Sequence, residues 1–203
     1  WDKVHVVETA LPQHQPLEQR SIADIAREQG SDPLTTMLDL ALAEDLRTTF
    51  VAQLLNSDED AVGRMLNHPH SLISLSDAGA HLTFFTDAGF GLHLLGHWVR
   101  ERGAMSLPAA VRRLTSQSAE LFGLPGRGLL REGHAADLLL FDPDTVGRAD
   151  KRRVFDLPGG APRLTTDAVG VHGVWVNGTL VADANGLVDG AALAGELMTR
   201  FER

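Results

Sequence analysis

The sequence contains no cysteine, which excludes disulfide bonds and thiolate metal sites and is compatible with a cytoplasmic location. No apolar run approaches the roughly 18 residues that span a bilayer. The start, Trp1-Asp2-Lys3, lacks the basic residues and apolar run of a signal peptide. Because the first residue is Trp rather than Met, we expect either that residues precede it in the natural protein or that this is a shortened chain.

Positive charge is also scarce, since 18 Lys and Arg face 27 Asp and Glu and give a net charge of −9. Nucleic acid and anionic membranes are therefore poor partners. The remaining composition is ordinary for a globular protein, with 43% hydrophobic and 22% charged residues among 203. This length predicts one domain, or one domain and a small second one, with a buried core.

The most informative stretch is residues 71–81, Ser-Leu-Ile-Ser-Leu-Ser-Asp-Ala-Gly-Ala-His. Its apolar residues at 72, 73 and 75 predict a short buried strand that stops at Asp77. A carboxylate at the carboxyl end of a buried strand, beside a glycine turn, is typical of catalytic groups in α/β enzymes. Gly79 would let a ligand approach the backbone. The alternative interpretation is that Asp77 only caps the next turn.

The residues up to Gly123 alternate between strand and helix signals. We expect strands near Val4 and Phe50, and helices that begin at Ser21, at Asp32-Pro33, near Ser57, near Leu92 and at Ser106. Together with the 72–75 strand, this order favours part of a parallel α/β array.

The residues after Gly123 read as β-rich. Strands are predicted at 135–141 and 169–176, and Asn177-Gly178 predicts a hairpin into residues 179–182. Residues 144–164 are charged and rich in Pro and Gly, which predicts a long loop. Residues 191–201 have helical composition. We therefore predict two domains, residues 1–123 and residues 124–203.

Several histidines have the spacing of metal ligands, but each has an alternative interpretation. His68-Pro69-His70 is an H-x-H pair, although Pro69 would be an ordinary helix stop. His93 and His97 lie one helical turn apart, but the glutamate of a zinc-binding H-E-x-x-H motif is absent between them, which favours packing or solvent roles. His81 follows Asp77 closely enough to line the same site.

Together these motifs resemble the amidohydrolase superfamily, and most of all the C-terminal part of the N-acyl-D-amino-acid deacylase (D-aminoacylase) group. Four segments carry the resemblance, and together they cover nearly the whole chain. They are His68-Pro69 with Ser76-Asp77-Ala-Gly-Ala-His81, the helix 114–123, the return strand of 127–143, and Val174-Trp-Val-Asn-Gly178.

The resemblance implies the last portion of a (β/α)8 TIM-barrel-like hydrolase in residues 1–123, followed by a small composite β-sandwich portion. It implies zinc-assisted hydrolysis of an amide in the complete enzyme, with a small N-acyl amine or N-acyl amino acid as substrate. Asp77 would be the catalytic proton acceptor and a candidate metal ligand. His81 and Gly79 would contact the substrate.

Two features differ from the group. The histidines and the carboxylate, Cys or modified Lys that bind the metal come mostly from strands that precede the Asp77 position in the family, so this chain alone is not expected to hold the zinc. Residues 82–99 contain no Arg or Lys to grip a substrate carboxylate. A rival hypothesis is a non-catalytic module that keeps part of the fold. In either case uncovered apolar surface predicts a homo-oligomer or association with the missing barrel half.

Overall fold

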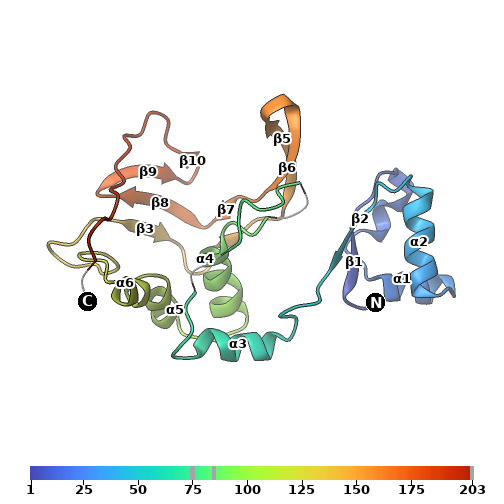
Figure 1. Ribbon diagram of the computed structural model, residues 1–203, viewed down its shortest axis with the longest axis horizontal. Helices are drawn as coiled ribbons and strands as arrows, with labels where there is room; N and C mark the ends of the chain where they lie inside the picture. Colours follow the sequence, from blue (N-terminus) through green and yellow to red (C-terminus); the bar gives the residue numbers. More distant parts are fainter. Residues whose placement is uncertain (74–75, 84–85, 202–203) are drawn as a thin grey trace. The chain divides into compact units, whose positions relative to one another are not determined.

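The computed structural model describes residues 1–73, 76–83 and 86–201 as a mixed α/β protein (Figure 1). Its contacts divide the chain into a first unit, Trp1–Val62, and a second unit, Gly63–Arg203. The predicted division at residue 123 lies inside the second unit and stays a prediction. No described helix combines the length and the hydropathy that a membrane span requires.

The first unit packs two helices and a short 3-10 helix against a two-stranded antiparallel sheet. The sheet pairs β1 with β2, with Val6 opposite Phe50. Val6 is fully buried and belongs to the core of this unit, together with Ile22, Ile25 and Leu40. The elements are β1 (Val4–Glu8), η1 (Pro12–Leu17), α1 (Ile22–Gln29), α2 (Pro33–Ala43) and β2 (Thr49–Ala52).

The helix signals of this unit are confirmed. The Ser21 hydroxyl accepts a hydrogen bond from the Asp24 N–H at the start of α1, and Gly30 ends that helix with a φ of 64°. Asp32 caps α2 through the Thr35 N–H, and Pro33 takes the first helical position.

The second unit contains the helical elements that follow residue 62, and one of them is a π-helix. The apolar side chains of Leu94, Leu95, Met105, Ala110 and Val146 form its buried core. The elements are α3 (Glu59–Asn67, which begins before the unit boundary), α4 (Phe90–His93), the π-helix η2 (Leu94–Glu101), α5 (Leu107–Leu114) and α6 (Ser116–Phe122). Asp58, rather than the predicted Ser57, caps α3 by accepting from the Ala61 N–H.

The remainder of the second unit is built from antiparallel strands in three sheets. The largest has the order β10-β9-β8-β3, and the Asn177-Gly178 turn joins β8 to β9 as predicted. Two smaller sheets pair β4 with β7 and β5 with β6. The strands are β3 (Leu138–Phe141), β4 (Gly147–Arg148), β5 (Arg152–Leu157), β6 (Ala161–Thr165), β7 (Ala168–Val169), β8 (Val171–Val176), β9 (Thr179–Asp183) and β10 (Gly186–Leu187), with the 3-10 turn η3 (Pro158–Gly160) between β5 and β6.

Three sequence expectations are wrong. Residues 144–164 contain the β5–β6 hairpin rather than a loop, because Pro158–Gly160 makes the turn and oppositely charged side chains pair across the strands. Residues 191–201 form no helix. Among the described residues every strand pairing is antiparallel, so the expected parallel array is not seen there.

The strand predicted over 72–75 is also not seen in its described part. Leu72 and Ile73 lie outside any strand, and residues 74 and 75 fall outside the described ranges. A buried parallel strand needs a hydrogen-bonded neighbour on each side. In place of such pairing, the Ile73 side chain packs against the core of the second unit.

Candidate functional site

Asp77 lies in a run of turns over Ser76–Thr83 whose backbone is unusual. Asp77 and His81 have positive φ values of 56° and 51°, and Gly79 between them has a φ of 95°. Left-handed backbone costs about 1–2 kcal/mol for a residue with a side chain. Positive φ also occurs at Asp45, Leu46 and Asn56, so it is the sequence motif of a carboxylate, a glycine and a histidine that makes this run the leading candidate.

Hydrogen bonds within this run and from β5 and β6 hold it among the described residues, since the Leu82 carbonyl accepts from the Leu164 N–H and the Thr83 carbonyl accepts from Arg153, each at 2.8 Å. The Ser76 hydroxyl accepts from the Ala78 N–H at 3.1 Å, and the Asp77 carbonyl accepts from the Ala80 N–H at 3.3 Å. The side chains of Asp77 and His81 and the backbone of Gly79 are exposed. Within the described residues, no hydrogen-bond donor reaches the Asp77 carboxylate. The structure therefore places the three predicted site residues in one exposed run, with their roles still predictions.

The chain segment that leads into these turns is fixed by a residue to which the sequence assigned no functional role. Its neighbour Arg112 pairs with Glu120 at 3.2 Å on the surface. Arg113 is half-buried instead, and its guanidinium donates to the backbone carbonyls of His68 and Ser71. No local signal distinguishes these two neighbours in the sequence.

The histidine pairs do not assemble a metal centre in the described part of the chain. No group of three or more His, Cys, Asp or Glu side chains there is arranged to hold an ion. His68 and His70 are exposed, with ring centroids 5.5 Å apart and rings tilted by 56°. A zinc site typically takes at least three protein ligands. The groups of side chains that come together in the described residues therefore do not fit a zinc site.

His93 and His97 stack on one face of the π-helical region. Their ring centroids are 4.9 Å apart and the rings are 6° from parallel, while His97 Nδ1 lies 3.0 Å from Glu101 Oε2. Burial, followed by the charges of Arg148 and His97, lowers the pKa of His93. The packing interpretation of this pair accounts for its stacking and partial burial.

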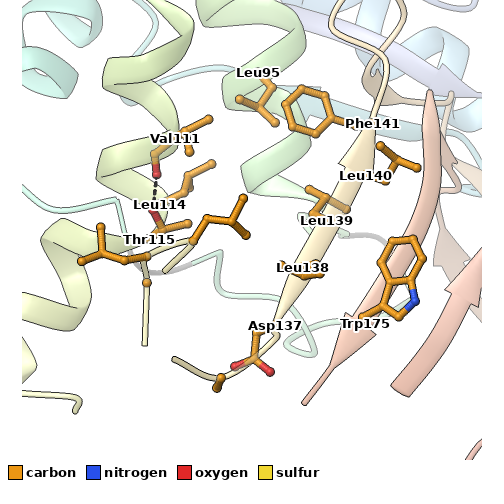
Figure 2. A pocket seen from close by; sticks show the side chains of 14 residues that line it. Leu95, Val111, Leu114, Thr115, Asp137, Leu138, Leu139, Leu140, Phe141 and Trp175 are labelled. Atoms are coloured by element: carbon orange, nitrogen blue, oxygen red, sulfur yellow. Dashed lines mark hydrogen bonds between the residues drawn. The ribbon is translucent and has the colours of Figure 1, made fainter. Parts of the chain in front are cut away.

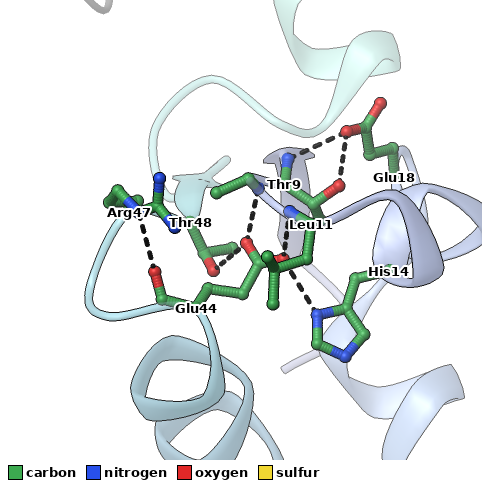
Figure 3. A network of polar contacts seen from close by, with 8 residues as sticks. Thr9, Leu11, His14, Glu18, Glu44, Arg47 and Thr48 are labelled. Carbon is green, nitrogen blue, oxygen red and sulfur yellow. Dashed lines mark hydrogen bonds and ion pairs between the residues drawn. The ribbon is translucent and has the colours of Figure 1, made fainter.

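A second carboxylate, in the first unit, is bound entirely within the protein (Figure 3). The Glu44 side chain is 0% exposed. It accepts hydrogen bonds from the Ala10 N–H at 2.7 Å, the Leu11 N–H at 2.9 Å and the Thr48 hydroxyl at 2.8 Å, and it contacts His14 Nδ1 at 2.8 Å. Burial alone would raise the pKa of Glu44, but these donors outweigh it and lower the pKa to about 2. All the acceptor positions face inward, so this site serves structure.

An apolar groove of about 520 Å³ lies between helix α5, residues 128–130 and strand β3 in the second unit (Figure 2). Figure 2 shows Val111, Leu114 and Thr115 facing the strand that carries Leu138 to Phe141. Asp137 lies at the edge of the groove and forms an ion pair with Arg127. The hydrogen bond from the Asn177 N–H, and after it the pairing with Arg127, lowers the pKa of Asp137, although burial acts in the opposite direction. No residue of the Ser76–Thr83 turns lines the groove, so the candidate chemistry is separate from it.

The comparisons with known proteins all point to the same family. A model of the amidohydrolase family matches residues 4–182. The chain is 32% identical over 166 residues to N-acyl-D-glutamate deacylase of Alcaligenes xylosoxydans xylosoxydans, covering 80% of this chain and 30% of that protein. It is 44% identical over 88 residues to D-aminoacylase of the same organism, covering 43% of this chain and 16% of that protein.

Solved structures give the same result. A D-aminoacylase structure superposes with a TM-score of 0.51 and 29% identity, covering 92% of this chain and 36% of that chain. A copper complex of a D-aminoacylase mutant gives a TM-score of 0.55 and 26% identity, covering 97% of this chain and 38% of that chain. The chain therefore spans less than two fifths of the length of each of these relatives.

Proposed function

This chain belongs to the amidohydrolase family, and on that premise we propose that it forms part of a metal-dependent hydrolase of amide bonds in N-acyl amino acids. The observation that carries the proposal is the similarity to deacylases over 80% of the chain, a span that includes an exposed aspartate in a strained turn. The substrate, a small acylated amine or amino acid, belongs to the proposal for the complete protein.

Asp77 is the proposed catalytic residue. An ionised carboxylate only accepts hydrogen bonds, so an exposed one is available to take a proton from a water molecule. As that water oxygen bonds to the amide carbonyl carbon, Asp77 would receive the proton. It would then deliver the proton to the nitrogen as the carbon–nitrogen bond breaks. The product is a carboxylic acid and a free amine.

Gly79 and His81 are proposed to contact the substrate. Gly79 has no side chain, so a substrate can approach the backbone of the turn closely. The His81 imidazole carries both a donor and an acceptor nitrogen, which suits it to a substrate oxygen.

Zinc belongs to the proposal for the complete protein rather than to this chain. Asp77 is the single candidate ligand among the predicted site residues, and the described residues do not surround it with others. The remaining ligands would come from other parts of the complete fold.

The finer fold is also a proposal: residues 1–123 as the last portion of a (β/α)8 barrel and residues 124–203 as part of a β-sandwich. The four-stranded antiparallel sheet of β3, β8, β9 and β10 supports the second assignment, because it lies wholly after residue 123. The cytoplasmic location stays a prediction.

The apolar groove favours a second candidate function, association. Its lining includes Leu130, Leu139 and Leu140, which are 89%, 44% and 54% exposed. Contiguous exposed apolar surface is typical of interaction sites. We propose that a second copy, or a polypeptide carrying other parts of the fold, covers this groove. Sedimentation of the chain alone tests this, and a monomer at all concentrations would contradict self-association.

The catalytic proposal is tested by Asp77→Asn in the full-length protein. We expect turnover of N-acyl amino acids to fall by about 10²–10⁴-fold, because the amide cannot accept the proton. The melting temperature of the 203-residue chain should hardly change, since the side chain is exposed there and Asn tolerates a positive φ. Near wild-type turnover would exclude the assignment.

Asp45→Asn is the matched control. Asp45 is also an exposed aspartate in the left-handed region, with a φ of 58°, but it lies in the first unit after α2. We expect its variant to keep full turnover.

A further inference from the structure

The root of the Asp77 turns is the segment His68–Ile73, which leaves the end of α3. Its backbone makes a compact turn, in which the Ser71 N–H donates to the His68 carbonyl at 3.1 Å. The Ser71 hydroxyl lies 2.6 Å from the Met65 carbonyl and 2.9 Å from that of His68. The last carbonyls of a helix need donors from elsewhere, and here Ser71 supplies one.

Arg113, on α5, connects this root to the rest of the second unit through hydrogen bonds. One guanidinium nitrogen donates to the His68 carbonyl at 2.9 Å, and the other donates to the Ser71 carbonyl at 3.1 Å and approaches the Ser71 hydroxyl at 3.4 Å. Gln117 of α6 adds a contact to the Ser71 carbonyl at 3.5 Å. The planar fork of an arginine can bind two carbonyls at once in a fixed geometry, which a lysine cannot do.

The Arg113 contacts influence the position of Asp77 because the chain between the root and Asp77 is short. Ile73 packs into the core immediately after the Arg113 contacts. Asp77 follows Ile73 by four residues, so the chain can place it at most about 14 Å away. On the far side of the turns, the Leu82 carbonyl accepts from the Leu164 N–H and the Thr83 carbonyl accepts from the Arg153 guanidinium, each at 2.8 Å. The position of the Asp77 carboxylate therefore depends on anchors on both sides of the turns, and Arg113 supplies the anchor on the N-terminal side.

We propose that Arg113 is a positioning residue for the Asp77 carboxylate, an inference that rests on the proposed function. Catalytic groups have to be held close to their productive geometry, and a displacement of about 1 Å can cost about 100-fold in rate. Without the guanidinium, the root would be held by Ile73, Ser71 and the weak Gln117 contact. Arg113 acts through Asp77 and needs no contact with the substrate.

The test measures kcat and KM of Arg113→Met in the full-length protein. We expect kcat to fall by about 10–100-fold while KM changes less than about threefold, because the proton acceptor moves and the substrate contacts stay. Arg113→Lys should recover part of the loss, since an ammonium can still donate to one carbonyl. It also serves as the test if the Met variant fails to fold.

The matched control is Arg112→Met, which removes the neighbouring guanidinium of the same helix from its surface pair with Glu120. It should keep wild-type kcat. In an Asp77→Asn background, Arg113→Met should produce no further loss, because the group that it positions has gone. A purely structural role would lower the residual rate in both backgrounds alike and would overturn the inference.

Failure of this inference and failure of the proposed function give different results. If Asp77→Asn is inactive while Arg113→Met has wild-type kcat, the positioning role is wrong and the catalytic proposal stands. If Asp77→Asn is fully active, both are wrong.

Discussion

Two carboxylates of this chain, Glu44 in the first unit and Asp77 in the second, lie in opposite environments. Glu44 is fully buried, and its oxygens face two backbone N–H groups, a hydroxyl and an imidazole. Asp77 is exposed in a left-handed turn, and no donor among the described residues reaches its carboxylate. The same functional group is therefore saturated with partners at one site and open at the other.

This difference indicates what each carboxylate contributes. A buried carboxylate with four partners joins distant parts of the first unit, since its donors come from residues 10, 11, 14 and 48. It has no acceptor position left for a ligand. An exposed carboxylate that no donor among the described residues reaches contributes little to stability and is open to a ligand. Stability and chemistry are thus expected to respond to different substitutions.

The largest stability effect is expected from Glu44→Gln. The amide keeps the shape of the side chain, but it places an NH2 donor where a buried donor now points. Hydrogen bonds to charged groups and unsatisfied buried donors each contribute a few kcal/mol, so the first unit should lose about 3 kcal/mol. Hydrogen exchange of the α1 amides in the 203-residue chain measures this loss.

Glu28→Gln is the control within the same unit. Glu28 pairs with Arg20 at 2.5 Å, but its side chain is 66% exposed. Exposed ion pairs contribute about 0–1 kcal/mol, so this variant should resemble the wild type. Equal exchange rates in the two variants would contradict the structural role of Glu44.

An effect of similar size is expected from pH. The pKa of Glu44 is about 2 in the folded chain against an ordinary value of 4.5. A lowered folded pKa means that the unfolded chain binds more protons in this range, so stability rises with pH there. The contribution is complete above about pH 4.5 and is lost as the pH falls toward about 2. Acid titration of α1 protection should show this loss, and Glu44→Gln should weaken it.

The elements predicted correctly are those with a complete local signal. The caps at Ser21 and Asp32 and the Asn177-Gly178 turn each depend on residues within one turn of the chain. The turn at Asp77 is local in the same sense, but the buried strand predicted before it is not seen in the described residues, and the role of Asp77 stays a prediction.

The features that the sequence could not predict depend on distant residues or on weak preferences. Arg113 contacts carbonyls more than 40 residues away, and Glu44 binds amides more than 30 residues away. Neither contact leaves a pattern in the neighbouring sequence. The helix expected over 191–201 relied on composition alone, and short helices are marginal without packing. The β5–β6 hairpin was missed because its strands carry charges, which pair across it as Arg163 with Asp156.

The smallest effects are expected from replacing one glycine by alanine in each unit. Gly30 and Gly79 both have positive φ, 64° and 95°, and neither has an atom within 4 Å of an added Cβ. Replacement by Ala therefore costs only backbone energy, about 1 kcal/mol at each site. The two positions differ in whether that energy lowers the stability of the whole unit or only that of a local turn.

Gly30 ends α1, where its N–H and that of Ser31 bond to the last carbonyls of the helix, so Gly30→Ala should destabilise the whole first unit by about 1 kcal/mol. Gly79 lies in an exposed turn that can open by itself, so Gly79→Ala should leave the global stability of the second unit within about 0.5 kcal/mol. Its effect should appear as roughly fivefold faster exchange of the Ala80 amide, which bonds to the Asp77 carbonyl. A global loss from Gly79→Ala as large as that from Gly30→Ala would mean that the Asp77 turn is part of the cooperative fold, and the contrast between a structural and an open carboxylate would then fail.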